Sequence, residues 1–203
     1  MAKERLFIAA NISDEQRANV ARLVEDLQKG ARFTKAHPKW ARVPGMHLTV
    51  RFLGNIEEAK KQEIIETLGP TIASCQAFDL SLAKLGVFPD ERNPRVLWLG
   101  VDKGKARLVT LAQTVQASLT PLGSAPEKRP YHPHLTLARI KSMRGVKALM
   151  DLVHSHRAVR CGKTRIGHLS LYQSELHPDG ARYTELHRWP LAGADEDSAY
   201  ASR

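Results

Sequence analysis

A tetrapeptide that occurs twice, as His47-Leu48-Thr49-Val50 and as His134-Leu135-Thr136-Leu137, constrains this chain more than any other feature. Alternate side chains of a β-strand point to opposite faces, so each copy places an imidazole and a hydroxyl on one face and two aliphatic side chains on the other. One face of each strand is therefore suited to a core, and the other to binding or chemistry.

The elements around the two tetrapeptides follow the same order, which predicts a duplicated chain. Residues 5–10 are expected to form a buried strand, and Ser13 with Gln16 a capping box for a helix that ends near Gly30. The first tetrapeptide then lies in a strand over 46–53, ended by Gly54 and Asn55. A strand over 95–101 and a helix over 105–119 repeat this plan before the second tetrapeptide.

The rest of the chain predicts further α+β structure. We expect an irregular loop over 32–44, a helix over 57–68 closed by Gly69-Pro70 or slightly later, and a short helix around 146–153. A strand over 78–82 should lead into a turn at 85–89, and strands over 164–176 and 182–189 should form a hairpin. We expect one bilobal domain over residues 1–191 and a disordered C-terminal tail over residues 192–203.

Composition indicates the kind of partner. The chain has 31 Lys and Arg against 21 Asp and Glu, a formal net charge of +10. That excess favours an anionic partner such as RNA or nucleotides, although a solvated basic surface is the alternative.

Cys75 and Cys161 are far apart and form no C-x-x-C pair, which predicts neither a zinc site nor a disulfide. No apolar stretch approaches the length of a membrane span or a signal-peptide core, so we expect a cytoplasmic protein.

The paired tetrapeptides contain the groups that phosphodiester hydrolysis needs. One histidine can remove a proton from the nucleophile while the other protonates the leaving oxygen, and threonine hydroxyls can donate hydrogen bonds to the phosphate. This scheme requires one histidine to be protonated and the other neutral near pH 7. Arg51 and Arg139 are nearby cations. The alternative is that the histidines only occupy half-exposed strand faces and the threonines serve β-propensity.

Other histidines predict less. His168-Leu169-Ser170-Leu171 resembles the tetrapeptides but lies outside the duplicated plan, which favours an ordinary strand. His132, His154 and His156 lack a third ligand at a recognisable spacing, so no metal site is expected. No P-loop is present.

Several segments together resemble one known family, the RNA 2′,3′-cyclic phosphodiesterases or 2′-5′ RNA ligases of the two-histidine phosphoesterase superfamily. The resemblance covers most of the chain and lies in 5–9 (RLFIA), 47–54 (HLTVRFLG), 86–89 (GVFP), 95–100 (RVLWLG), 133–139 (PHLTLAR), 174–176 (SEL) and 180–183 (GARY).

The resemblance implies two pseudo-twofold-related lobes whose antiparallel sheets line a central cleft, with helices outside and no metal or organic cofactor. It implies hydrolysis of RNA 2′,3′-cyclic phosphate ends to 2′-phosphates, and the reverse 2′-5′ ligation. His47 would protonate the departing 3′-oxygen and His134 would activate water. Thr49, Thr136 and Arg139 would hold the phosphate.

Three further residues are candidates, and one of the implied residues poses a geometric problem. Arg139 lies at an odd offset from His134, so a bulge or the end of the strand must turn it toward the site. Arg51, which should share a face with His47, stands where the family often has lysine. Phe7 and Trp40 are the aromatic residues to test for base stacking, although both suit a core. A non-catalytic RNA- or nucleotide-binding module with the same basic cleft is the alternative function, and we expect a monomer.

Overall fold

The computed structural model describes residues 3–31, 38–125, 127, 129–177 and 180–194. Within these residues the chain forms four α-helices and nine strands. The helices are α1 (Asp14–Ala31), α2 (Glu58–Ala73), α3 (Lys105–Leu119) and α4 (Val146–Ser155). The strands are β1 (Lys3–Ala10), β2 (Lys39–Trp40), β3 (Leu48–Glu57), β4 (Phe78–Phe88), β5 (Val96–Val101), β6 (His134–Arg139), β7 (Arg160–Ile166), β8 (His168–His177) and β9 (Gly180–Pro190). Short 3-10 helices lie at Val43–Gly45 and Thr120–Leu122.

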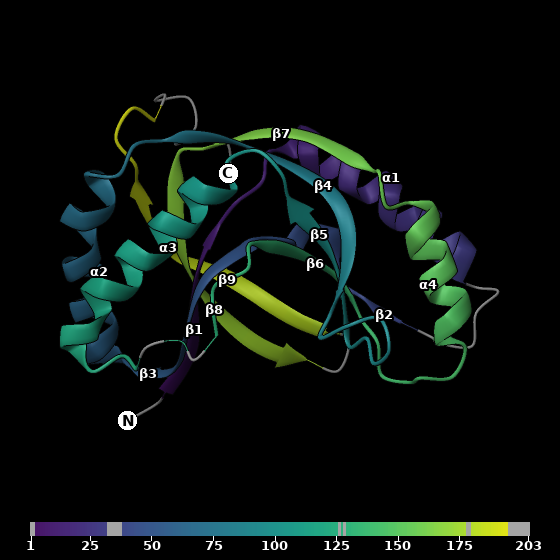
Figure 1. Ribbon diagram of the computed structural model, residues 1–203. Coiled ribbons are helices and arrows are strands. Elements are labelled where there is room, and N and C mark those ends of the chain that lie inside the picture. The colour runs from purple at the N-terminus through teal and green to yellow at the C-terminus, as the bar shows by residue number, and fades with distance from the viewer. Residues whose placement is uncertain (1–2, 32–37, 126, 128, 178–179, 195–203) are drawn as a thin grey trace.

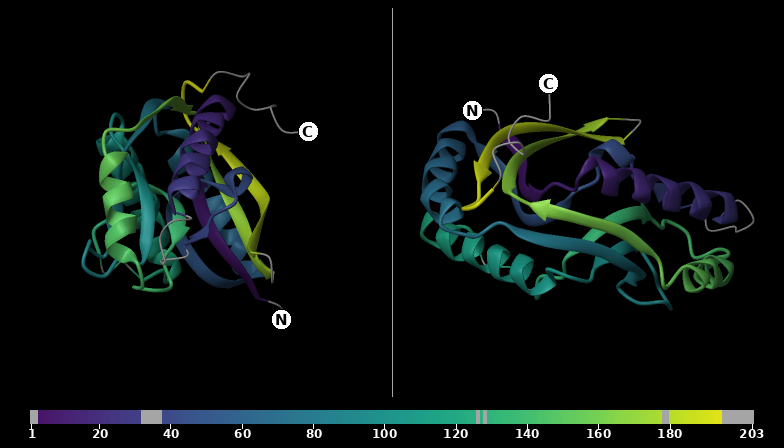
Figure 2. Two further views of the ribbon diagram at one scale, coloured as in Figure 1. Left: turned by 90° about the vertical axis from the view of Figure 1, so that its right-hand side faces the viewer. Right: turned by 90° about the horizontal axis from the view of Figure 1, so that it is seen from above.

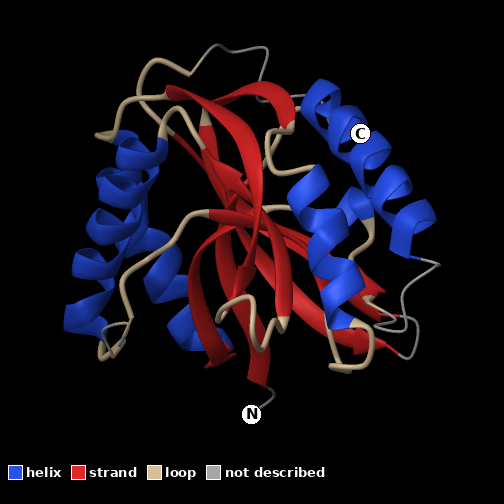
Figure 3. Cartoon of the chain, turned by 45° about the vertical axis from the view of Figure 1, so that its right-hand side comes forward, coloured by secondary structure: helices blue, strands red, loops and turns tan. Residues whose placement is uncertain are grey.

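The strands form one curled sheet in the order β7-β4-β5-β6-β3-β1-β8-β9, with β2 paired to β6. All pairs between these strands are antiparallel. Helices α2 and α3 pack together at one end of the sheet, and α1 and α4 pack together at the other (Figures 1 and 2). The helices therefore lie outside the strands, and the sheet runs between the two helix pairs (Figure 3).

The two halves of the sheet meet where the two tetrapeptides pair. Leu48 of β3 is the register partner of Leu135 of β6, and both side chains are fully buried. An antiparallel pair of strands has a local twofold axis, which here relates the two halves. The predicted α+β bilobal fold is confirmed, and the two expected sheets are halves of one continuous sheet.

Helix α1 begins with half of the predicted capping box. The Ser13 hydroxyl accepts a hydrogen bond from the Gln16 amide at 3.2 Å. The Gln16 side chain does not return to Ser13, because it donates to the Gly162 carbonyl at 3.1 Å. The Ser13 amide donates instead to the Thr164 hydroxyl at 2.8 Å. Thr164 of strand β7 thus accepts the hydrogen bond from the Ser13 amide that the Gln16 side chain would accept in a complete capping box.

Several predicted boundaries are wrong. Strand β3 continues through Gly54, whose φ of 82° is accessible to glycine at little cost. Helix α2 ends at Ala73, slightly after Gly69-Pro70 as the prediction allows, and so includes the exposed Pro70. Pro70 lies in the last turn of α2, so the backbone hydrogen bond that it removes is close to the end of the helix. The turn expected at 85–89 is mostly the end of β4, and the strand expected over 164–176 is two strands separated by Gly167.

The chain remains attached to the domain beyond residue 191. The Ala192 amide donates to the Cys75 carbonyl at 2.9 Å, and the Ala77 amide donates to the Ala192 carbonyl at 2.8 Å. The remainder of the predicted tail, residues 195–203, lies outside the described residues, as do residues 32–37 of the predicted loop.

The leucine pair at the junction of the halves yields a stability prediction. Leu48→Ala should lower the free energy of unfolding by about 2–5 kcal/mol, because it leaves a cavity at a fully buried site. Urea denaturation followed by circular dichroism measures this. Leu176→Ala is the matched control: that side chain is 76% exposed, and its loss should change stability by less than about 0.5 kcal/mol. Equal effects of the two substitutions would contradict the assigned role of Leu48.

Candidate active site

Each motif strand contains a β-bulge at the fourth residue of its tetrapeptide. In the pairing of β3 with β1, Ala9 faces Thr49 and Ile8 faces Arg51, so Val50 is the extra residue. In the pairing of β6 with β5, Trp98 faces Thr136 and Leu97 faces Ala138, so Leu137 is the extra residue. The two bulges occupy equivalent positions, which supports the duplication.

The bulges change which residues share a face with the histidines. An extra residue inverts the alternation beyond it. Arg51 and Ala138 are accordingly buried, whereas Phe52 is 57% exposed and Arg139 is exposed. The expected bulge that turns Arg139 toward the site is present. The prediction that Arg51 shares a face with His47 is wrong, and Phe52 takes that place.

Arg51 is an anchor for the segment that leads into β6. It is 6% exposed, and its Nη1 lies 2.7 Å from the Glu127 carboxylate. Its Nη2 donates to the Ser124 hydroxyl at 3.1 Å and also to the Ala125 carbonyl. The Tyr131 hydroxyl adds a hydrogen bond of 2.8 Å to the Thr49 carbonyl. These contacts engage both terminal nitrogens of the guanidinium and hold residues 124, 125, 127 and 131 against β3.

The histidines and threonines lie on one face at the junction of the halves. The Leu48–Leu135 register, continued by one residue in each direction, places His47 opposite Thr136 and Thr49 opposite His134. Directly opposed Cβ atoms lie about 4.5–5.5 Å apart in such ladders, and diagonal pairs about 7–8 Å. A phosphate group fits between two histidines at that separation.

Both imidazoles are held in the same way. His47 Nδ1 lies 2.9 Å from the Gly45 carbonyl, and His134 Nδ1 lies 2.7 Å from the His132 carbonyl. A carbonyl only accepts hydrogen bonds, so Nδ1 of each ring is the donor. The Nε2 atom of each neutral ring is then a base, and in the protonated ring it is an acid. The pair can therefore remove one proton and deliver another across a bound group.

His47 is covered by aromatic rings from three strands. Phe7 stacks on it with ring centroids 4.6 Å apart, and Tyr183 meets it edge-on at 5.0 Å. The Tyr172 ring lies beside both, with its centroid 5.4 Å from that of Phe7 and 6.1 Å from that of His47. Phe7 is only 2% exposed, so it supports His47 and is not available for stacking on a substrate base.

His134 lies beside a second aromatic cluster. Phe88 meets His134 edge-on with centroids 5.0 Å apart and meets His132 at 5.2 Å. Trp98 packs on Phe88 at 5.1 Å, over Gly86, where a Cβ would lie 2.3 Å from the indole. A glycine is required at that position because the ring lies against its backbone.

Burial makes both histidines weak bases. Desolvation, with a smaller contribution from the Arg17 charge, lowers the pKa of His47 to about 4 despite the hydrogen bond to Gly45. Desolvation also lowers the pKa of His134, and the charges of His132 and Arg139 add to this effect. The surrounding residues thus favour two neutral rings at pH 7, in contrast to the expected protonated and neutral pair. A phosphate anion beside Nε2 would raise both pKa values.

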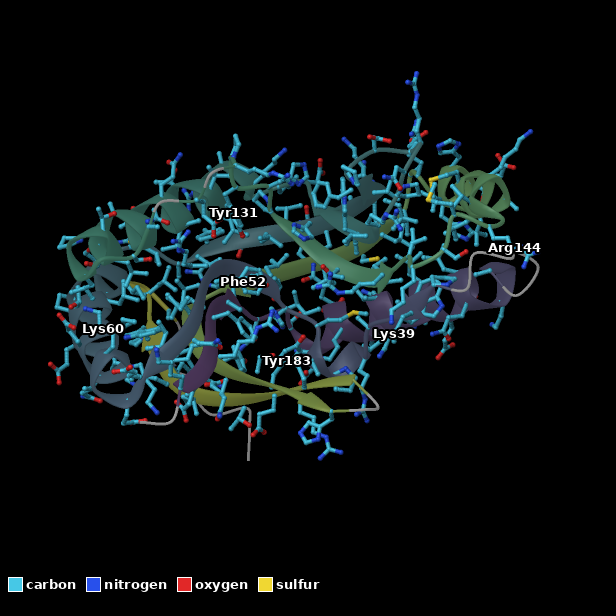
Figure 4. All side chains as sticks on the ribbon, turned by 90° about the horizontal axis from the view of Figure 1, so that it is seen from below. Lys39, Phe52, Lys60, Tyr131, Arg144 and Tyr183 are labelled. Carbon is cyan, nitrogen blue, oxygen red and sulfur yellow. The ribbon has the colours of Figure 1, made fainter. Side chains whose placement is uncertain are left out.

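Each histidine borders its own cavity. A cavity of about 940 Å³ is lined by Thr49, His134, Phe52, Phe88 and Val96, among others. A smaller cavity of about 420 Å³ is lined in part by His47, Tyr172 and Tyr183. Viewed from below, Phe52 and Tyr183 lie near the middle of the molecule (Figure 4).

The remaining sequence candidates lie elsewhere. Trp40 of β2 pairs with Ala138 and packs partly buried against the core. His168, in strand β8 as predicted, lies 3.3 Å from the Asn11 side chain and borders the smaller cavity. His154 contacts Glu91 at 3.1 Å. Among the described residues there is no group of three His, Cys, Asp or Glu suited to a metal ion.

Sequence reasoning did not single out Phe52, Tyr172 or Tyr183. The only available signal for Phe52 was its place in the segment 47–54.

Among the residues that the structure describes, no helix has the length and apolar character needed to cross a membrane.

The fold places a pair of histidines, suited to acid–base chemistry, on a duplicated α+β scaffold. A family model for the 2′-5′ RNA ligase superfamily matches residues 14–178. The chain belongs to the 2′-5′ RNA ligase superfamily, and the resemblance noted in the sequence is confirmed.

Curated relatives agree with this assignment. The chain is 33% identical over 184 residues to the RNA 2′,3′-cyclic phosphodiesterase of Methanothermobacter thermautotrophicus, a match that covers 91% of this chain and 97% of the relative. It is 38% identical over 148 residues to the protein of the same name from Aeropyrum pernix, covering 73% of this chain and 83% of the relative.

Solved structures share the fold. Thermus thermophilus TT0787 matches with a TM-score of 0.74 and 26% identity, covering 94% of this chain and 100% of that one. Escherichia coli LigT complexed with 3′-AMP matches with a TM-score of 0.73 and 24% identity, covering 93% and 98% of the two chains.

The pKa of His47 yields a test of the site electrostatics. In an NMR titration of the imidazole carbons, His47 should titrate near pH 4, well below an ordinary histidine. The unfolded chain binds a proton there between about pH 6.5 and 4 while the folded chain does not, so stability should fall as pH falls through that window. His47→Gln should reduce this pH dependence. A His47 midpoint near 6.5 would contradict the assignment.

Proposed function

We propose that this protein is a metal-independent RNA 2′,3′-cyclic phosphodiesterase that opens terminal cyclic phosphates to 2′-phosphates. The observation that supports this best is the matched pair of imidazoles, each with Nδ1 bonded to a carbonyl two residues earlier and with Nε2 left for chemistry. Family membership and the names of the curated relatives point to the same reaction. The assignment of an enzymatic activity to this chain is thus supported by the imidazole pair and by its relatives.

The proposed reaction is one in-line displacement at phosphorus. His134 Nε2 accepts a proton from water as the water oxygen attacks the phosphorus atom. The bond from phosphorus to the 3′-oxygen breaks, and His47 Nε2 delivers its proton to that oxygen. The hydroxyls of Thr49 and Thr136 donate hydrogen bonds to the non-bridging oxygens, and Arg139 adds positive charge. The product is a 2′-phosphomonoester, and proton exchange with solvent resets both histidines.

Substrate binding would favour uptake of a proton from solvent by His47. The pKa of His47 is lowered mainly by burial, and an anion at the site counteracts that effect. A cyclic phosphate therefore favours the protonated ring only when it is in place. The two identical motifs become unequal because the 3′-oxygen lies near one and water near the other.

The larger cavity is suited to the terminal nucleoside. It borders Thr49 and His134, and Phe52 offers an exposed aromatic ring at its edge. Bases stack on such rings with little dependence on sequence. We therefore assign base stacking to Phe52 in place of Phe7 and Trp40.

A non-catalytic RNA- or nucleotide-binding module is the second candidate, supported by the net charge of +10. The reverse reaction, 2′-5′ ligation, would use the same groups because a catalyst lowers one barrier in both directions. The monomeric state and the cytoplasmic location stay predictions from the sequence.

The histidine roles predict large losses of turnover. His47→Ala and His134→Ala should each reduce kcat for a cyclic-phosphate oligonucleotide by about 100-fold or more, since each removes a proton-transfer group. His154→Ala, on α4 and paired with Glu91, is the control and should retain activity. Circular dichroism verifies folding. Full turnover in both site variants would favour the binding module.

The product reports which oxygen leaves. An oligonucleotide with a 2′,3′-cyclic phosphate end, incubated with EDTA present, should yield only a 2′-phosphate, because His47 is assigned to the 3′-oxygen. Phosphorus NMR distinguishes the 2′- from the 3′-phosphate. Loss of activity in EDTA would contradict the proposal that the reaction needs no metal ion. A 3′-phosphate product would show that the 2′-oxygen leaves in place of the 3′-oxygen.

The stacking role of Phe52 is tested separately. Phe52→Ala should reduce kcat/KM by about 5- to 100-fold, since stacking contributes about 1–3 kcal/mol per base, while Phe52→Tyr should preserve it. Leu176→Ala, another exposed apolar side chain, provides the background. Equal kcat/KM for Phe52→Ala and wild type would show that the base binds elsewhere.

A further inference from the structure

Two cations stand directly opposite each other at the edge of the site. Lys39 of β2 is the register partner of Arg139 of β6, and both side chains are exposed. Residues in register on antiparallel strands project from the same face, so the two charges share a face. Like charges directly opposite each other destabilise a sheet pair.

No described acidic residue offsets these charges. Neither Lys39 nor Arg139 forms an ion pair with a carboxylate in the described part of the chain. Other lysines do have a partner, such as the half-buried Lys60 with Glu63 at 2.7 Å. An anion from outside the chain would turn the repulsion between Lys39 and Arg139 into attraction.

The pair lies beside the catalytic groups on their own face. Arg139 follows Thr136 in β6 after the bulge, which places its Cα roughly 7–10 Å farther along the strand. That separation is of the order of one nucleotide of an RNA backbone. Lys39 lies toward the end of the molecule where Arg144 is found, whereas Lys60 lies at the opposite end (Figure 4).

We propose that Lys39 binds the phosphodiester that joins the terminal nucleotide to the one before it, next to the cyclic phosphate beside Arg139, so that the body of the RNA leaves the site over β2. This proposal rests on the proposed function and adds a direction to it. A cyclic mononucleotide lacks that phosphodiester. Lys39 therefore contributes to the recognition of oligonucleotides and not to the reaction itself.

The experiment compares two substrates at several salt concentrations. With an oligonucleotide that ends in a 2′,3′-cyclic phosphate, Lys39→Glu should reduce kcat/KM about 10-fold and weaken its dependence on KCl, because one phosphate contact is lost. With adenosine 2′,3′-cyclic phosphate, kcat/KM should change less than about twofold. Lys39→Arg should retain the oligonucleotide rate. Lys60→Glu makes the same charge change at the far end and should leave both rates unchanged.

The outcomes separate this proposal from the proposed function. If the wild-type protein hydrolyses neither substrate, the proposed function is wrong, and this inference is wrong with it. Wild-type protein that opens both, with Lys39→Glu affecting both equally or neither, overturns this inference alone. An equal effect of Lys60→Glu on the oligonucleotide would also overturn it, since net charge and not position would then explain the result.

Discussion

The cross-strand pair of Leu48 and Leu135 is the contact on which the site depends. It is the only register pair between β3 and β6 in the described residues, and it joins the two halves of the sheet. Because both leucines are buried on one face, the flanking histidines and threonines must lie on the other. A symmetric contact between two copies of one motif thus brings four polar side chains from opposite halves of the chain together.

The symmetry of the scaffold does not extend to the chemistry. The equivalent bulges at Val50 and Leu137 bring an aromatic residue, Phe52, onto the site face in one half and a cation, Arg139, in the other. The surroundings of the histidines differ as well, since His47 lies under Phe7 and Tyr183 while His134 lies beside Phe88. Duplication therefore supplies a pair of histidines, and divergence of the neighbouring residues supplies the two sides that we propose for binding the base and the phosphate.

Burial and charge act in opposite directions at this site. The aromatic rings that fix the orientation of His47 also desolvate it and lower its pKa to about 4. An imidazole with so low a pKa is mostly unprotonated at neutral pH unless an anion beside it raises that pKa. The net charge of +10 and the exposed cations near β2 favour that anion. In the proposed mechanism, binding of phosphate and protonation of His47 are thereby linked.

The sequence by itself determined the elements with clear periodicity and the pairing of the motifs. The helix expected over 105–119 is α3, and the histidine–threonine face follows from a period of two residues. Tertiary structure decided which way Arg51, Phe52 and Arg139 face, because a bulge exists only in register with a neighbouring strand. It also decided that Arg51 is an anchor, since its partners at residues 124, 125 and 127 are more than seventy positions away in the chain. The same holds for the pKa of His47, which depends on rings and charges that distant segments bring to it.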